Sequence, residues 1–275
     1  MIAVIGFNGF IGSALTLSLL DRGHKVLGVS RSGSYSLKRS GEETLLNTEE
    51  MYEQLSNDVQ FVIFCAGKGV PFLDKCEAEI RHGELALAKY WLGLSERYGC
   101  RFIYLSTIAV ESGEQSLYVN LKREVEALIK EYTVESIVLR LCSVFGQNQN
   151  VRLLFDLLSK ISETEGTITM RGSGTEKRSW IFLPALAEFI CDVVSQINKY
   201  SNIHKGVVAV YGRTYSVRSF CEAVIAIRAP NRLLEFSQTD HIGAKDLSFM
   251  SSSRASLSVI MEPLNDCLKS CIKNE

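Results

Sequence analysis

The first dozen residues constrain the fold of this chain more than any other segment. The apolar run from Ile2 to Ile5 has the length and composition of a short buried strand. It passes directly into a G-x-x-G-x-x-G turn, and a helical pattern begins inside that turn at Phe10 and continues to Asp21. A strand, a glycine-rich turn and a helix in immediate succession predict the start of a β-α-β unit.

Short apolar runs then alternate with longer helical patterns. The predicted strands cover 2–5, 25–29, 61–65, 101–105 and 136–139, with a further short strand at 44–46, and the predicted helices cover 10–21, 48–55, 72–97 and 116–131. Apolar strands separated by helices are typical of a parallel sheet that is covered on both faces. We therefore expect an α/β fold, a Rossmann-type doubly wound parallel sheet.

The pattern changes after about residue 150. The later elements are predicted helices at 152–162, 216–227 and 264–272, strands at 180–183 and 207–211, and a helix that Pro184 opens, which is a favoured position for proline. We expect residues 1–165 to form the sheet domain. Residues 166–275 are expected to form a smaller C-terminal substrate lobe, partly interleaved with the sheet domain.

Each glycine of the first turn has a physical role if a dinucleotide binds there. Gly6 permits the tight turn, Gly9 lets the backbone approach the pyrophosphate, and Gly12 lets the helix pack close to the strand. The start of the helix, at Phe10 and Ile11, offers free N–H groups and a positive dipole end to the phosphates. A purely structural turn is the alternative, but its place after a first strand favours NAD(P) binding by residues 1–165.

The end of the second predicted strand bears on the choice of cofactor. A site for NAD places an acidic residue there to accept from the ribose hydroxyls. This chain has Ser30, Arg31 and Ser32 instead. A guanidinium suits a 2′-phosphate, so the sequence favours NADP, and NAD is the alternative cofactor. Arg31 could also be a solvated loop residue without a role in binding.

A tyrosine and a lysine share one face of the predicted helix at 116–131. Tyr118 and Lys122 are four residues apart, and Thr107 follows the strand at 101–105, at the sheet edge where ligands bind in open α/β folds. A free tyrosine has a pKa of about 10 and needs a nearby cation to exchange a proton near neutral pH. We predict that Tyr118 is a general acid or base, that Lys122 assists it and contacts the cofactor, and that Thr107 orients the reacting oxygen. A surface Tyr–Lys pair is the structural alternative.

Six segments together resemble the extended short-chain dehydrogenase/reductase family, in particular its nucleotide-sugar epimerase/dehydratase/reductase branch. They are VIGFNGFIG (4–12), VIFCAG (62–67), FIYLSTIAV (102–110), YVNLK (118–122), LRLCSVFG (139–146) and GSGTEKRSWIFLPALA (172–187). The resemblance covers most of the chain. It places Thr107 at the family's catalytic Ser/Thr position, with Ser106 as a lesser candidate.

The resemblance also implies roles for residues outside the trio. Cys65, Ala66 and Gly67 fall on the family's cofactor-lining loop, and Arg178 falls where an arginine contacts the diphosphate of the substrate. Ser143 stands where the family usually has a substrate-binding asparagine. A nucleotide sugar is therefore the expected substrate.

The absence of one pair of acidic residues narrows the expected activity. Sugar 4,6-dehydratases of this family carry an Asp-Glu pair after the catalytic threonine, whereas Ile108 and Ala109 follow Thr107 here and cannot shuttle a proton. We expect NADP-dependent reduction of a 4-keto nucleotide sugar, with hydride from the nicotinamide and a proton from Tyr118. The alternatives are an NAD-dependent 4-epimerase and a non-catalytic dinucleotide-binding sensor or scaffold.

Composition excludes other classes of function. The formal net charge is -1, from 30 basic and 31 acidic residues, so the chain lacks the basic surplus typical of nucleic-acid binding. Its eight cysteines form no C-x-x-C pair and there is no apolar stretch of membrane-spanning length, so we expect reduced thiols in a cytoplasmic protein without a membrane segment. The histidines show no ligand spacing, and no metal site is predicted.

The helices at 84–97 and 118–131 are those through which members of the family often dimerise. Trp91, Leu92 and Leu94 offer an apolar patch for such a contact, or else they face the sheet. A homodimer is the predicted assembly.

Overall fold

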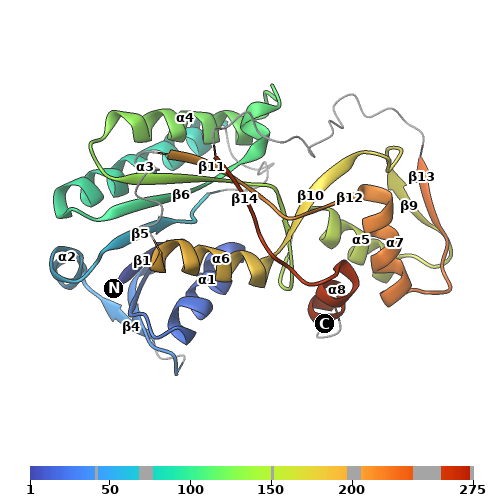
Figure 1. The fold of residues 1–275 in the computed structure, drawn as a ribbon, viewed down its shortest axis with the longest axis horizontal. Helices are drawn as coiled ribbons and strands as arrows, with labels where there is room; N and C mark the ends of the chain where they lie inside the picture. Colours follow the sequence, from blue (N-terminus) through green and yellow to red (C-terminus); the bar gives the residue numbers. More distant parts are fainter. Residues whose placement is uncertain (41–42, 68–76, 150–151, 197–205, 238–254, 273–275) are drawn as a thin grey trace.

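A nine-stranded sheet forms the centre of the molecule (Figure 1). The computed structural model describes residues 1–40, 43–67, 77–149, 152–196, 206–237 and 255–272. In spatial order the strands are β14 (Ala255–Ser258), β11 (Gly206–Tyr211), β7 (Ser136–Leu141), β6 (Arg101–Thr107), β5 (Phe61–Phe64), β1 (Ile2–Ile5), β2 (Val26–Ser30), β3 (Gly33–Leu37) and β4 (Glu43–Leu46). Neighbours from β14 to β2 are parallel, which confirms the predicted doubly wound sheet.

Helices cover both faces of this sheet. On one face α1 (Phe10–Asp21) packs against α6 (Leu183–Ser195), and on the other face lie α2 (Thr48–Asn57), α3 (Glu77–Tyr98) and α4 (Leu117–Glu131), as Figure 1 shows. Trp91, Leu92 and Leu94 of α3 are buried in the second of these layers. They therefore face the sheet, which is the second of the two arrangements expected for them.

A smaller lobe has a hydrophobic core of its own. Its strands form a three-stranded sheet, β12 (Arg213–Ser216), β10 (Lys177–Phe182) and β8 (Ser143–Phe145), and a two-stranded sheet, β13 (Leu234–Ser237) and β9 (Ile168–Arg171); its helices are α5 (Arg152–Glu163), α7 (Val217–Arg228) and α8 (Leu264–Ile272). Trp180 stacks on Phe220 at its centre, with ring centroids 4.1 Å apart. The chain passes between the lobes several times, because α6, β11 and β14 belong to the large sheet and its helical layers.

Most predicted elements form where the sequence places them. Helix α1 has the predicted bounds, and α2 begins behind Asn47, whose side chain accepts from the backbone N–H of Glu50 at 2.9 Å while the Glu50 carboxylate accepts from the N–H of Asn47 at 2.8 Å. The predicted strand at 44–46 exists as β4. The helix predicted from residue 72 is described from Glu77, and 72–76 lie outside the described residues.

One edge of the sheet differs from a simple parallel arrangement. β3 follows β2 after a two-residue turn, Arg31 and Ser32, and it pairs antiparallel with both β2 and β4. Its sequence, GSYSL, is largely polar and half-buried, which is typical of a strand near a sheet edge. Because of this composition, a search for apolar runs does not find the strand. Along the described chain, no helix is both long and apolar enough to cross a membrane.

The glycine turn after β1 tolerates no side chain at Gly12. A Cβ there would lie 2.0 Å from the carbonyl oxygen of Gly6, so Gly12→Ala must force the turn open. We expect this change to lower the free energy of unfolding by at least about 1–3 kcal/mol, measured by urea denaturation. Gly93→Ala is the matched control, because a Cβ at this position of α3 would meet no atom within 4 Å beyond its chain neighbours and the adjacent backbone of its own helix, and alanine favours a helix by roughly 0.5–1 kcal/mol. Equal stability of the two variants would contradict the close packing of the turn.

Candidate functional site

The glycine turn packs directly against the loop that follows β5. Gly6 has a φ of +86°, and a Cβ on it would lie 2.9 Å from the backbone nitrogen of Ala66. Gly9 is the N-cap of α1, and no side chain caps this helix or places a carboxylate in its first turn, at Phe10 and Ile11. The first N–H groups of α1 therefore have the free donors and dipole that a phosphate needs.

Hydroxyl groups surround Arg31 at the β2–β3 turn. The Oγ atoms of Ser30 and Ser32 lie 2.8 Å apart, and the Tyr35 hydroxyl donates to Ser32 Oγ at 3.2 Å. The Tyr35 ring also lies beside Phe7 of the glycine turn, with centroids 5.7 Å apart. Sequence reasoning missed Tyr35 because it missed β3. Arg31 is exposed, and these groups together form a polar rim at the end of β2.

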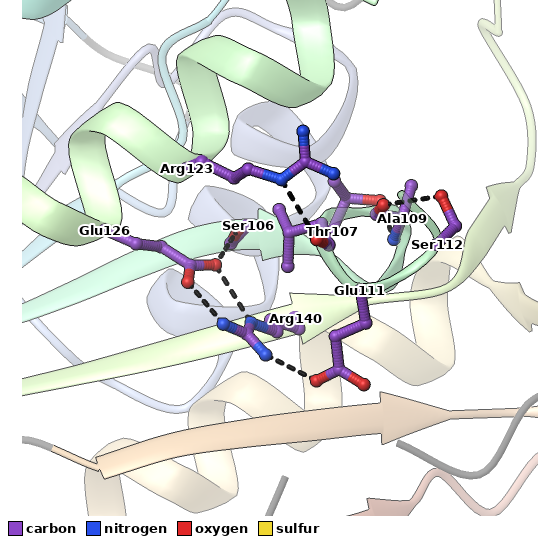
Figure 2. A network of polar contacts seen from close by, with 9 residues as sticks. Ser106, Thr107, Ala109, Glu111, Ser112, Arg123, Glu126 and Arg140 are labelled. Atoms are coloured by element: carbon purple, nitrogen blue, oxygen red, sulfur yellow. Dashed lines mark hydrogen bonds and ion pairs between the residues drawn. The ribbon is translucent and has the colours of Figure 1, made fainter. Parts of the chain in front are cut away.

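Strand alternation separates Thr107 from Ser106 at the end of β6. Thr107 is half-buried and its Oγ1 accepts from the N–H of Ala109 at 3.3 Å, which caps the short 3-10 helix η1 (Ile108–Glu111). Ser106 is buried and donates instead to Glu126 of α4 (Figure 2). Ser106 is already hydrogen-bonded to a carboxylate on the other face of the strand. Of the two hydroxyls, that of Thr107 is therefore the better placed to bind a ligand.

Ion pairs fix the turn after β6 relative to α4. Figure 2 shows the Glu126 carboxylate accepting from Arg140 of β7, which also pairs with Glu111 of η1. Arg123 of α4 donates to the carbonyl of Val110 at 3.0 Å. The turn that carries Thr107 is thus attached to the helix that carries Tyr118 and to the neighbouring strand.

Helix α4 turns Lys122 into the protein interior. Ser116 caps the helix, its Oγ accepting from the N–H of Val119 at 3.4 Å. Lys122 is buried, and its Nζ donates to the carbonyl oxygen of Leu105 at 3.1 Å. The same Nζ lies 5.8 Å from the ring centre of half-buried Tyr118. The predicted pair therefore shares one face of α4, with the lysine beneath.

Lys122 meets two further polar residues that the sequence did not single out. Glu84 of α3 has its Oε1 3.8 Å from Lys122 Nζ, and both side chains are 7% exposed. Tyr104 of β6 is fully buried, and its ring centre lies 4.8 Å from the same Nζ. Burial lowers the pKa of the Lys122 ammonium, but these neighbours more than offset that effect, so its pKa lies above the ordinary value. Lys122 is therefore a cation throughout the neutral pH range.

The loop after β5 brings the glycine turn and Lys122 together. A Cβ on Gly67 would lie 3.3 Å from Lys122 Nζ and 3.2 Å from Glu84 Oε1, while Ala66 contacts Gly6. Burial raises the pKa of the Cys65 thiol to about 12, against the opposing effect of Lys122, so this cysteine stays neutral. Three segments singled out in the sequence, around residues 6–12, 65–67 and 118–122, thus form one continuous site.

Arg178 and Ser143 lie in the smaller lobe. Arg178 is on β10 and Ser143 begins β8, where it pairs with Trp180. The Nε of Arg178 is buried and makes no hydrogen bond within the described structure, and its Nη2 lies 4.0 Å from a carboxylate oxygen of Glu176. A buried guanidinium nitrogen without a hydrogen bond is suited to bind an anionic ligand.

A sequence signal for Glu84 exists. The buried positions of α3 are Ile80, Glu84, Ala88, Trp91, Leu92, Leu94 and Ser95, and most of them follow a helical stripe. An acidic residue within such a stripe is unusual, because carboxylates are rarely buried without a partner. Tyr104 gives no comparable signal, since tyrosine is common in buried strands.

The geometry defines a dinucleotide-binding α/β fold with a Tyr–Lys pair at the carboxyl ends of its strands. Residues 2–209 match the model of the NAD dependent epimerase/dehydratase family. The chain belongs to this family, and with it to the NAD(P)-dependent enzymes of the extended short-chain dehydrogenase/reductase type. No curated protein matches the chain.

Solved structures share the fold at low sequence identity. The Bordetella bronchiseptica enzyme WbmH in complex with NAD+ is 17% identical, with a TM-score of 0.75 over 99% of this chain and 97% of that one. UDP-glucuronic acid 4-epimerase from Bacillus cereus, with UDP-glucuronic acid and NAD, is 19% identical, with a TM-score of 0.73 over 98% and 96%. The GDP-mannoheptose C4 reductase from Campylobacter jejuni with NADP bound is 17% identical, with a TM-score of 0.68 over 86% and 87%.

The network around Glu126 gives a stability prediction. Glu126→Gln removes a buried carboxylate that accepts from both Ser106 and Arg140, so the free energy of unfolding should fall by about 3 kcal/mol in urea denaturation. Glu131→Gln, at an exposed position at the end of the same helix, should change it by no more than about 0.5 kcal/mol. Similar losses in the two variants would show that the network stabilises no more than a surface carboxylate does.

Proposed function

We propose that the protein reduces the keto group of a 4-keto nucleotide sugar with NADPH. The observation that supports this best is the buried ammonium of Lys122, one helical turn from Tyr118 and next to the Gly67 loop. The residues of this site fit a dinucleotide: the open N-terminus of α1, the glycine turn and the loop at 65–67 would hold it. When bound, the reduced nicotinamide supplies a hydride to the keto carbon.

The residues of the chain supply the proton and the orientation. Tyr118 donates its phenolic proton to the keto oxygen as the alcohol forms. The Lys122 cation stabilises the phenolate that remains. Thr107, held at the end of β6 by its capping bond, hydrogen-bonds the reacting oxygen and orients it.

The residues after Thr107 argue against elimination of water. Ile108 and Ala109 are apolar and 8% and 7% exposed, so this position offers no acid or base for dehydration. Reduction and 4-epimerisation need only the trio described above. Because the UDP-glucuronic acid 4-epimerase from Bacillus cereus shares this fold, an NAD-dependent 4-epimerase is the alternative proposal.

NADP is the proposed cofactor. Arg31 and the hydroxyls of Ser30, Ser32 and Tyr35 form the rim where the 2′-phosphate of the adenosine would lie, and no acidic residue stands at this turn. The C4 reductase with NADP bound gives this reading a structural parallel. Release of the cofactor from purified protein and its identification separates the two proposals, because an epimerase of this kind would retain NAD.

The nucleotide-sugar substrate is proposed to reach the smaller lobe. The buried, unpaired Nε of Arg178 provides a donor for its diphosphate, and Ser143 provides a hydroxyl on the adjacent strand. The diphosphate would satisfy a buried donor that the described chain leaves without a hydrogen bond.

Two further proposals concern assembly and location. Leu87 and Tyr90 are 38% and 44% exposed on the outer side of α3, so a homodimer through α3 and α4 would bury them rather than Trp91. Light scattering at micromolar concentration tests this assembly. The cysteines in the described ranges are all free, which supports a reducing compartment such as the cytoplasm.

Loss of the phenol should abolish turnover but not binding. Tyr118→Phe should lower kcat for NADPH-dependent reduction of a 4-keto sugar nucleotide by about 10²–10⁴-fold, because the proposed proton donor is lost. Tyr52→Phe, at a half-buried tyrosine of α2 that pairs with Tyr90, is the control and should keep wild-type turnover. Undiminished turnover in Tyr118→Phe would remove this residue from the mechanism.

The cofactor preference depends on one guanidinium. Arg31→Ala should weaken NADPH binding by about 10–100-fold and leave NADH binding unchanged, since a hydrogen bond to a charged group contributes about 1.5–3 kcal/mol. Isothermal titration calorimetry measures both affinities. Arg39→Ala serves as the control, because Arg39 is an exposed arginine near the same sheet edge that pairs with Asp21. Equal losses for NADPH and NADH would contradict a 2′-phosphate site.

A further inference from the structure

A carboxylate lies inside the protein next to the predicted catalytic pair. Glu84 is on the buried stripe of α3, where its neighbours along the stripe are Ile80 and Ala88. Its side chain is 7% exposed, and its Oε1 is 3.8 Å from the Nζ of Lys122. Burying an ion pair costs desolvation energy that the attraction often fails to recover, so structural need alone is a weak explanation for this pair.

The two helices are already joined at their surface. Arg81 of α3, one turn before Glu84, pairs with Glu124 of α4 at 2.9 Å, and these side chains are 56% and 31% exposed. The inner and outer ion pairs therefore connect the same helices with opposite polarity. The outer pair already joins α3 to α4 at the surface, and of the two pairs the inner one involves Lys122.

Among the residues that the structure describes, one acidic side chain lies beside Lys122. Its Nζ is faced by Glu84 from α3, by the Tyr104 ring from β6, by Cys65 from the end of β5 and by Tyr118 from α4. Burial raises the pKa values of Tyr104 and of the Cys65 thiol, so both are neutral near pH 7. Glu84 is thus the residue that balances the lysine charge.

We propose that Glu84 is a positioning residue that holds the Lys122 ammonium between the Leu105 carbonyl and the Gly67 loop and offsets part of its charge toward Tyr118. This inference rests on the proposed function, because it assigns Lys122 and Tyr118 to proton transfer. An unbalanced cation would favour the phenolate of Tyr118 strongly. With Glu84 beside it, the pair is nearly neutral, and the net charge that acts on the Tyr118 phenol is smaller.

The direction of this effect suits reduction. A reductase needs the phenol in its protonated form before each turnover, because the phenol is the proton donor. A carboxylate next to the lysine extends the pH range in which that form is present. The Gly67 backbone is close enough to both charged atoms that the same pair also sets the position of the loop.

The test uses the ligand-free protein, so that it does not depend on turnover. Tyrosinate absorbance is followed by ultraviolet difference titration, and subtracting a Tyr118→Phe protein in each background isolates the signal of Tyr118. Glu84→Gln should move the midpoint of that signal to lower pH by about 0.5–1 unit, because the lysine charge is no longer balanced. Glu84→Asp keeps the charge but withdraws it by one methylene, so its midpoint should move in the same direction by less. Glu124→Gln removes the outer carboxylate and should leave the midpoint in place.

The outcomes separate the two proposals. A midpoint that is unchanged in both Glu84 variants, or that moves equally in Glu124→Gln, would overturn the role of Glu84. If Glu84→Gln does not fold, Glu84→Asp decides by itself. Calorimetric titration with NADPH is run in parallel: a wild-type protein that binds no dinucleotide would defeat the proposed function while the titration still reports on Glu84. If Glu84 also fixes the loop at Gly67, the Glu84→Gln protein should bind NADPH several-fold more weakly than the Glu124→Gln protein.

Discussion

The buried ammonium of Lys122 is the interaction on which the arrangement of the site depends. A charge in the interior is tolerated only where hydrogen bonds and an opposite charge replace water, and here the Leu105 carbonyl and Glu84 do so. These two partners come from β6 and α3, while the lysine comes from α4. Three elements must therefore be in register for the cation to be stable, and the same register brings Lys122 next to Gly67 in the loop at 65–67.

The sequence predicts the elements that are built from strong local signals. The glycine turn fixes β1 and α1 because a Cβ on Gly12 has no space, and the capping box of Asn47 and Glu50 fixes the start of α2. The strands that are not predicted, β3, β8, β9, β12, β13 and β14, are short, and several of them are polar. The strand at 33–37 gains its structure from pairing with β2 and β4, which is a tertiary effect that no window of sequence contains.

Some residues of the candidate site can likewise be predicted from local sequence, whereas others depend on tertiary contacts. The spacing of Tyr118 and Lys122 places them on one helix face without reference to the rest of the molecule. Choosing between Ser106 and Thr107 requires knowing which face of β6 meets α4, and the bond from Ser106 to Glu126 settles that orientation. Glu84 belongs to a helix that is distant in sequence, and although it falls on the apolar stripe of that helix, its partner Lys122 is identified only by the tertiary structure.

The charged groups of the two lobes differ in how completely their polar atoms are paired. In the large sheet, Glu84 and Lys122 balance each other, and Arg140 is matched by carboxylates on either side. In the smaller sheet, Arg178 has a buried Nε without a hydrogen bond in the described structure, and its nearest carboxylate is at 4.0 Å. In the proposed function, the diphosphate of the substrate would bind this guanidinium nitrogen in the smaller lobe, while Tyr118 and Lys122 would act on the sugar in the large lobe. Binding of the anion would then be separated in space from the proton transfer.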